Sequence, residues 1–434
     1  MSRVLAFLAA LAIAAEAASA IAQPATPPPG AAMAAPPLPA PAPPPPAPAP
    51  TVAPPPPVQV TQLAAPDAFS TPGRDTGLPP TLWRGASLAI VKAVLPQLAG
   101  RALPPAAAAL ARRVLATGAP GPEGAGSDPA LTAARAAALI AQGDPQAAAA
   151  ILARAPGLDR NADLARVAAE AELLAGRDGH ACQIEEGLTS GRDDIYWLRL
   201  RTYCEAVAGK SAEAQLTFDV AQAQAKDPVF ARLMAAKLAG GGDPGAASLR
   251  SGLDLALSRS LGLDLSQARA SPEVAAALAA GGPSEPAFDV AAAPPDLAPT
   301  VAALVGADPL PPAGLERLLD AAEVREPKAR ARGQAAALLC APFFEPLGPT
   351  LRARVAALNV PQGRASAARL MILADAAADQ RLGETALVAL WLTAEAGPAG
   401  LSPGERAQVV RALRRAGFER DARAFALEGL LALK

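Results

Sequence analysis

A glycine recurs every 33 residues in the middle of the chain, and this spacing constrains the fold more than any other feature. The four glycines are Gly143, Gly176, Gly209 and Gly242. An alanine follows each glycine by five residues, and a small residue precedes it by seven; these positions are Ala148, Ala181, Ala214 and Ala247, and Ala136, Ala169, Thr202 and Ala235. A fixed interval of this length is typical of stacked structural repeats. We therefore predict a repeat array over residues 128–245.

Each repeat is predicted to contain two helices joined at the glycine. In the first unit, residues 129–142 and 145–154 are the expected helices, because proline favours a first helical turn and Gly143 can adopt the left-handed conformation of a tight turn. The next units are expected at 162–175 with 178–188, and at 193–208 with 211–226. A helical hairpin with one apolar face cannot bury that face alone, so successive hairpins should stack.

The composition indicates an all-α fold. Hydrophobic residues make up 51% of the chain but aromatic residues only 3%, and alanine supplies most of the apolar count. Alanine and leucine favour helices, whereas the β-branched and aromatic residues that fill strands are sparse. A core of this kind must be built from close contacts between helices rather than from large rings.

These units resemble tetratricopeptide (TPR) repeats. The resemblance rests on the small residue at the Ala136 position, the turn glycine at the Gly143 position and the alanine at the Ala148 position, and it covers roughly a quarter to a third of the chain. The period is one residue shorter than that family's, and the family's large aromatic positions do not recur. The resemblance implies a divergent right-handed superhelix of stacked hairpins that serves as a scaffold for a protein or peptide.

The N-terminus has the pattern of a secretory signal peptide over residues 1–22. Arg3 precedes an apolar run over residues 4–15, and two A-x-A sites, at 18–20 and 20–22, follow it. The run is shorter than the roughly 20 residues that a spanning helix needs. We expect cleavage, with retention as an anchor the alternative, and a periplasmic or secreted mature chain with no membrane span.

Residues 23–80 are predicted to be a disordered arm rich in proline and alanine. Eighteen prolines fall between residues 24 and 57, and each lacks an amide donor and fixes φ. The arm is expected to be an inert linker, a spacer or a ligand for a proline-binding groove.

The remaining chain is predicted to form two helical lobes. The first covers residues 81–280 and contains the repeats, with Pro96 expected to end or kink its first helix. A proline-rich junction is expected at 281–313. The second lobe, 314–434, has turn glycines Gly383 and Gly417 at a spacing of 34.

Cys182 and Cys204 lie in consecutive predicted helices that should be neighbours in a hairpin stack. In an oxidising compartment they are expected to form a disulfide, the alternative being two separate buried thiols. Cys340 follows two leucines and is expected to be buried, or otherwise to form an intermolecular bond.

No residue is predicted to be catalytic, to bind a cofactor or to bind a metal. His180 is the only histidine, so neither a zinc site nor a His-dependent triad has its usual residues. The sequence contains no nucleophile elbow, Walker or Rossmann glycine motif. The adjacent carboxylates at 185–186 and 193–194 are interpreted as helix caps or solvated faces. Five C-terminal arginines, Arg411, Arg414, Arg415, Arg420 and Arg423, are interpreted as a solvated surface or a contact for an acidic partner.

The charge balance argues against nucleic-acid binding and bulk attraction to anionic membranes. The chain has 39 basic and 40 acidic residues, a net charge of −1. We expect an exported, non-enzymatic scaffold for an unknown protein or peptide partner in the bacterial cell envelope. The alternatives are a structural component of envelope assembly and, less favoured, a peptidoglycan-acting enzyme of the lytic transglycosylase type, whose catalytic glutamate-serine signature is not found. An ice-binding role is disfavoured because regular threonine arrays are missing.

Overall fold

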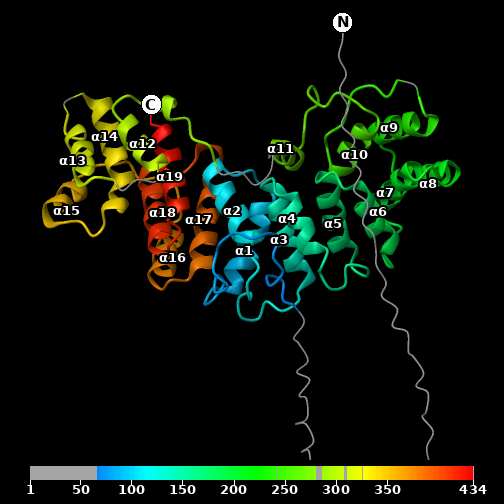
Figure 1. Cartoon of the computed structure of the whole chain (residues 1–434), viewed down its shortest axis with the longest axis horizontal. Coiled ribbons are helices and arrows are strands. Elements are labelled where there is room, and N and C mark those ends of the chain that lie inside the picture. The colour runs from blue at the N-terminus through cyan, green and yellow to red at the C-terminus, as the bar shows by residue number, and fades with distance from the viewer. Residues whose placement is uncertain (1–65, 242, 280–285, 307–309, 325, 434) are drawn as a thin grey trace, which may run out of the picture. The chain divides into compact units, whose positions relative to one another are not determined.

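The computed structural model describes residues 66–433 apart from 242, 280–285, 307–309 and 325 (Figure 1). The predicted signal peptide, most of the predicted arm and Gly242 lie outside these residues. Within them the chain forms nineteen α-helices and no strand beyond an isolated bridge between Leu249 and Ala270. The predicted all-α class is confirmed for this part of the chain. None of its helices is both long and apolar enough to cross a lipid bilayer.

The helices have the following bounds. Those of the first half are α1 (Leu88–Ala99), α2 (Pro105–Ala116), α3 (Pro129–Ala141), α4 (Pro145–Leu152), α5 (Ala162–Leu174), α6 (Asp178–Gly187), α7 (Ile195–Val207), α8 (Ser211–Gln224), α9 (Pro228–Ala239), α10 (Gly252–Ser260) and α11 (Pro272–Ala279). Those of the second half are α12 (Ala298–Val305), α13 (Pro312–Ala321), α14 (Pro327–Cys340), α15 (Pro349–Ala356), α16 (Ala367–Ala378), α17 (Leu382–Ala396), α18 (Pro403–Arg415) and α19 (Glu419–Leu431).

Three of the predicted repeats form helical hairpins. The pairs α3–α4, α5–α6 and α7–α8 each pack together, and each pair also contacts the next. Their turns contain Gly143, Gly176 and Gly209, with φ of 80°, 77° and 75°. The small residues at the repeat positions are fully buried where the helices cross; these are Ala136, Ala148, Ala169, Ala181, Thr202 and Ala214. This arrangement is compatible with an α-helical repeat.

The fourth predicted unit does not continue this pattern. Helix α9 ends at Gly240, which adopts the left-handed conformation (φ 64°) of a C-terminal cap. Ala235 is exposed, and Ala247 lies outside any helix. The next helix begins only at Gly252, after the cap residue Ser251.

The two C-terminal glycines differ from each other. Gly417 lies in the turn between α18 and α19 with φ 83°, as predicted. Gly383 instead lies in the first turn of α17, and the left-handed residue in that connection is Gln380 (φ 57°). Gly383 is needed for packing, because a Cβ there would lie 2.5 Å from Cε3 of Trp83. The interpretation of Gly383 as a repeat turn is therefore wrong.

The helix containing Pro96 is not interrupted at that residue. Helix α1 runs through Pro96 to Ala99. Pro96 and Lys92, four residues earlier, are both exposed, so water can hydrate the Lys92 carbonyl that the proline leaves without an amide donor.

The C-terminal hairpins pack directly against the first helices of the chain. Helix α17 contacts α1 and α2, and α19 contacts α2. One hydrophobic core therefore includes residues from Ala68 to Leu430 and joins the two predicted lobes. The predicted junction does not separate two cores, and part of it forms α12, which packs on α19.

The last residues of the predicted arm are part of the fold. Phe69 is fully buried and packs on Trp83 with ring centroids 4.7 Å apart. The guanidinium of Arg135, also fully buried, donates to the carbonyl oxygens of Ala68 at 2.9 Å and Thr71 at 3.1 Å. Residues 66–80 thus lack regular helices but are anchored, because an aromatic ring and several backbone acceptors are buried there.

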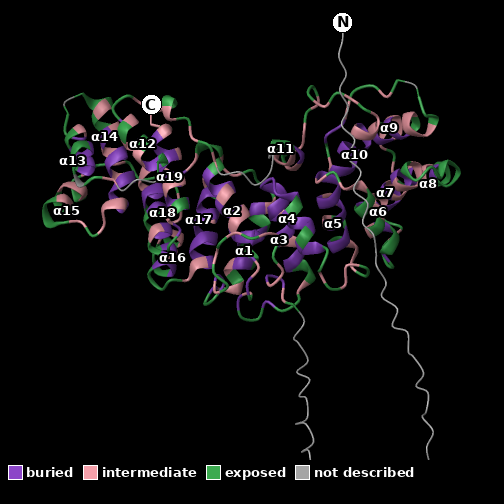
Figure 2. Cartoon of the chain, in the orientation of Figure 1, coloured by how far each residue is buried: buried purple, intermediate pink, exposed green. Residues whose placement is uncertain are grey.

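Helix α5 separates two hydrophobic cores. Its Leu164, Ala168 and Leu174 belong to the main core, whereas Ala169 and Leu173 belong to a second core shared with α6, α7, α9 and α10. Figure 2 shows the buried residues along these inner faces, and exposed residues over α8 and α15. The boundary between the two cores leaves room for a cavity.

Candidate functional site

A cavity of about 500 Å³ lies where the two cores meet, and it is the candidate site. Ile140 and Leu174 contribute apolar wall from the side of the main core, and Phe230 and Leu253 from the side of the second core. Charged and hydroxyl groups from α5, α7, α9 and α10 complete the lining. A concave site with apolar walls and a few polar groups is suited to binding a ligand.

The N-termini of four helices converge on this cavity. Each N-terminus carries a partial positive charge, equivalent to about half an elementary charge, on its free amide groups. The chain's own side chains already accept hydrogen bonds from these amides: Asp194 caps α7, Asp227 caps α9, Ser251 caps α10 and Ser271 caps α11. At least one amide of each helix end therefore already donates to a carboxylate or hydroxyl of the chain itself.

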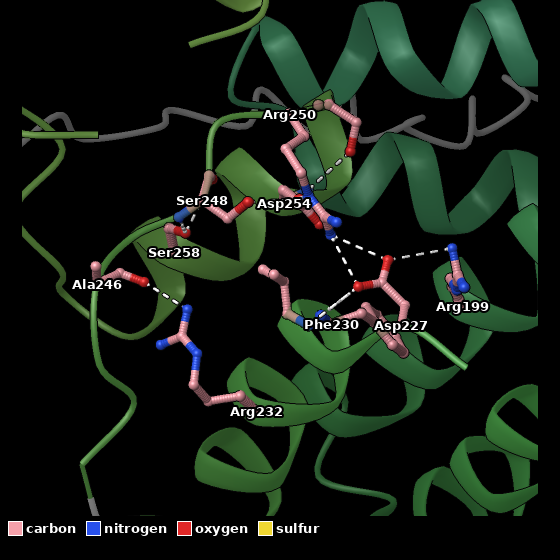
Figure 3. Close-up of polar contacts among 12 residues, drawn as sticks. Arg199, Asp227, Phe230, Arg232, Ala246, Ser248, Arg250, Asp254 and Ser258 are labelled. Carbon is pink, nitrogen blue, oxygen red and sulfur yellow. Dashed lines mark hydrogen bonds and ion pairs between the residues drawn. The ribbon is translucent and has the colours of Figure 1, made fainter. Parts of the chain in front are cut away.

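A row of ion pairs joins α7, α9 and α10 along one wall (Figure 3). Arg250 Nε lies 2.6 Å from Asp254 Oδ2, and its Nη2 lies 3.0 Å from Asp227 Oδ2. Arg199 Nη1 approaches Asp227 Oδ2 at 3.5 Å, and the Arg199 guanidinium lies over the Phe230 ring. Burial acts to raise the pKa of Asp227, but hydrogen bonds from Arg250 and the Phe230 amide outweigh it and lower that pKa overall.

The loop that carries Arg250 is held in place by hydroxyl and carbonyl contacts (Figure 3). Ser248 donates from its hydroxyl to Asp254 at 2.7 Å, and its amide donates to the Ser258 hydroxyl at 3.0 Å. Arg232 donates to the Ala246 carbonyl at 2.7 Å. This wall of the cavity is consequently preorganised without a ligand.

A corner of the cavity beside the start of α10 contains two buried polar side chains, those of Glu170 and Tyr196. Glu170 Oε2 accepts a hydrogen bond from the Gly252 amide at 2.7 Å. Glu170 Oε1 and the Tyr196 hydroxyl are both buried, and the two side chains interact with each other through a hydrogen bond. Burial raises the pKa of Glu170, and burial together with the Glu170 charge raises the pKa of Tyr196 well above its ordinary value.

The charged groups lining the cavity have an acidic surplus. Five carboxylates face three guanidinium groups, a difference of two negative charges when all are ionised; they are Glu170, Asp194, Asp227, Asp254 and Glu273 against Arg166, Arg199 and Arg250. Arg199 and Arg250 already pair with Asp227 and Asp254. The remaining groups are Glu170, Asp194 and Glu273 against Arg166, which accounts for the surplus of two negative charges.

The predicted disulfide is present, outside the cavity lining. Cys182 on α6 and Cys204 on α7 are bonded, with their Cα atoms 5.5 Å apart. Cys340, at the end of α14, is fully buried, and burial raises the pKa of its thiol to about 12.

The other residues singled out in the sequence lie away from the cavity or are engaged in ion pairs. His180 is 60% exposed, with Nδ1 3.7 Å from Glu172 Oε2. Asp194 caps α7 as expected, but Glu185 is buried and not solvated, because Arg201 and Arg192 pair with it at 2.7 Å and 3.0 Å.

The C-terminal arginines do not form an uncompensated basic face. Arg411 and Arg415 pair with Glu345, and Arg414 and Arg423 pair with Glu419. These pairs reduce the positive charge available to an acidic partner.

Over the described part of the chain, no group of three or more His, Cys, Asp or Glu side chains is arranged to hold a metal ion. Comparison of the chain with protein-family models, curated proteins and solved structures finds no match.

Proposed function

We propose that the protein is an exported, non-enzymatic helical scaffold, and that the cavity beside α5 binds a peptide segment of a partner protein. The observation that carries this proposal is the cavity itself: apolar walls from two cores, bordered by a preorganised row of charges. A peptide offers apolar side chains for such walls and amide groups for the polar rim. The TPR-like stacking of α3–α8 into a superhelix is part of the same proposal.

Export to the periplasm rests on the sequence of residues 1–22, and the Cys182–Cys204 bond supports it because structural disulfides persist in oxidising compartments. N-terminal sequencing of protein recovered from the periplasmic fraction tests this part. We expect a mature end at residue 21 or 23. Full-length protein confined to the cytoplasm would contradict it.

Site-specific photocrosslinking in cells tests the binding site. A photoreactive amino acid replaces Glu273, which is half-buried at the cavity, and in a second strain Glu316, which is exposed on α13. We expect one discrete crosslinked product from position 273 and none from position 316. Identical patterns at the two positions would contradict peptide binding in the cavity and would favour a structural component of the envelope.

A further inference from the structure

The corner formed by Glu170, Tyr196 and Arg166 has features that the proposed peptide cavity does not by itself require. Glu170 and Arg166 lie four residues apart on α5, and Tyr196 lies in the first turn of α7. Residues at this spacing share one face of a helix. The corner therefore brings together a carboxylate, a phenol and a guanidinium within the cavity lining.

We propose that this corner is a subsite for a basic side chain, lysine or arginine, of the bound peptide, and that Arg166 occupies it while the peptide is absent. This inference rests on the proposed function, because it names the chemistry of one ligand position in the same cavity.

Arg166 makes few contacts in this corner, so a ligand cation can displace it. Its guanidinium carbon lies 4.8 Å from the centroid of the Tyr196 ring, a cation–π arrangement. The side chain is exposed, and among the residues that the structure describes it makes no hydrogen bond or ion pair. Its positive charge nevertheless acts on Glu170. An exposed arginine held by one ring face can swing into solvent at little energetic penalty.

The oxygen atoms beneath Arg166 are suited to a cation with N–H donors. Glu170 Oε1 and the Tyr196 hydroxyl are buried, and the two side chains interact only with each other there, while Oε2 accepts from the Gly252 amide. Both oxygens are closed to water. In this proposal Arg166 leaves the Tyr196 ring face, and an incoming ammonium or guanidinium takes its place there beside the Glu170 carboxylate.

The surrounding charges favour a cation over an anion. The converging helix N-termini would attract an anion, but Asp194, Asp227 and Glu170 already accept from their amides. With those donors engaged, an incoming anion finds fewer free amides, and it meets five carboxylates against three arginines in the cavity lining. A buried carboxylate next to an acidic neighbour, Asp254, gains most from an added positive charge.

Capped peptides test the subsite on the full chain. The probes are acetyl-Ala-Leu-X-Leu-Ala-amide with X as lysine, arginine, glutamine or norleucine, titrated by calorimetry into the wild type, Glu170→Gln, Tyr196→Phe and Arg166→Ala. Glu186→Gln and Arg160→Ala serve as controls, because each removes the same charge from an exposed position outside the cavity lining.

We expect the lysine and arginine peptides to bind the wild type about tenfold more tightly than the norleucine peptide. Glu170→Gln should reduce this preference below twofold, and Tyr196→Phe should reduce it partly. Arg166→Ala should tighten binding of the basic peptides several-fold without affecting norleucine. The two control variants should behave as the wild type.

Two contrary results have different meanings. If all peptides bind equally, or if the preference for basic peptides survives in both Glu170→Gln and Tyr196→Phe, the subsite is overturned while peptide binding stands. If no peptide binds and no crosslink forms at position 273, the proposed function is overturned together with the subsite.

Discussion

The carboxylate of Glu170 accepts a hydrogen bond of 2.7 Å from the amide of Gly252, across 82 residues of sequence. The contact joins α5 to the first turn of α10 and fixes one side of the cavity. The buried carboxylate is stabilised by a helix N-terminus and also interacts with the Tyr196 hydroxyl on α7. This arrangement has consequences for stability as well as for binding.

Glu170→Gln should stabilise the fold at neutral pH. Because the pKa of Glu170 is raised above 4.5 in the folded state, the unfolded chain releases its proton first, and stability falls as pH rises from about 4.5 through the raised folded pKa. A neutral glutamine avoids this loss and can still accept from Gly252. We expect a gain on the order of 1 kcal/mol at pH 7 that disappears near pH 4. Denaturant titrations at both pH values measure it; equal stability at pH 7 would contradict it.

Gly252→Ala should destabilise the protein through a clash with Glu170. An added Cβ would lie 2.6 Å from Glu170 Oε2 and 3.2 Å from the Leu173 Cβ. We expect a loss of about 1–3 kcal/mol, as for other overpacked sites. Combining it with Glu170→Ala in a double-mutant cycle should recover part of the loss. Strictly additive effects would show that the two residues do not contact each other.

Arg135→Met should release the segment 66–80. The guanidinium is fully buried and donates to four backbone carbonyls, those of Ala68, Thr71, Leu115 and Thr117. Burial lowers its pKa to about 9, so it is charged at neutral pH. Leaving these acceptors unpaired should destabilise the fold by about 3–5 kcal/mol. Limited proteolysis should then cut near residue 74, whereas Arg160→Met should resist; equal resistance would contradict the anchoring role.

Removing the disulfide should destabilise the α6–α7 pair. The bond joins residues 22 positions apart. The entropy that a loop of this length removes from the unfolded chain corresponds to a stabilisation of about 3 kcal/mol. We expect that loss in Cys182→Ala/Cys204→Ala. A thiol assay on the wild type should detect one group, Cys340, and only after denaturation, because burial and the raised thiol pKa protect it. Three reactive thiols would contradict the bond.

Local periodicity predicted the hairpins but not the contacts between hairpins that lie far apart in the sequence. The glycine spacing located three turns because a left-handed residue and a buried alanine are needed at each crossing. The same pattern misled at Gly383, where the absent side chain makes room for Trp83, a residue 300 positions earlier in the chain. The packing of α17 on α1 and α2 rests on such long-range contacts, and spacing carries no information about them.

The candidate site was missed at the sequence level for a related reason. Glu170 is one of many acidic residues on predicted helices, and its burial depends on Gly252, far along the chain. A partial signal existed at Asp227-Pro228 and Ser251, which mark helix starts. Such caps locate helix N-termini but do not show that several of them converge.

The pH dependence of binding tests the central claim, that a ligand cation is held against the Glu170 carboxylate. Glu170 faces Arg166 on its own helix, Tyr196 on α7, and the Gly252 amide and Asp254 on α10. Because burial raises its pKa, protonation at low pH removes the negative charge that attracts a cation. The affinity of the lysine peptide should therefore rise with pH through that pKa, relative to norleucine, and the rise should be absent in Glu170→Gln. Parallel pH profiles for the lysine and norleucine peptides on the wild type would contradict the account.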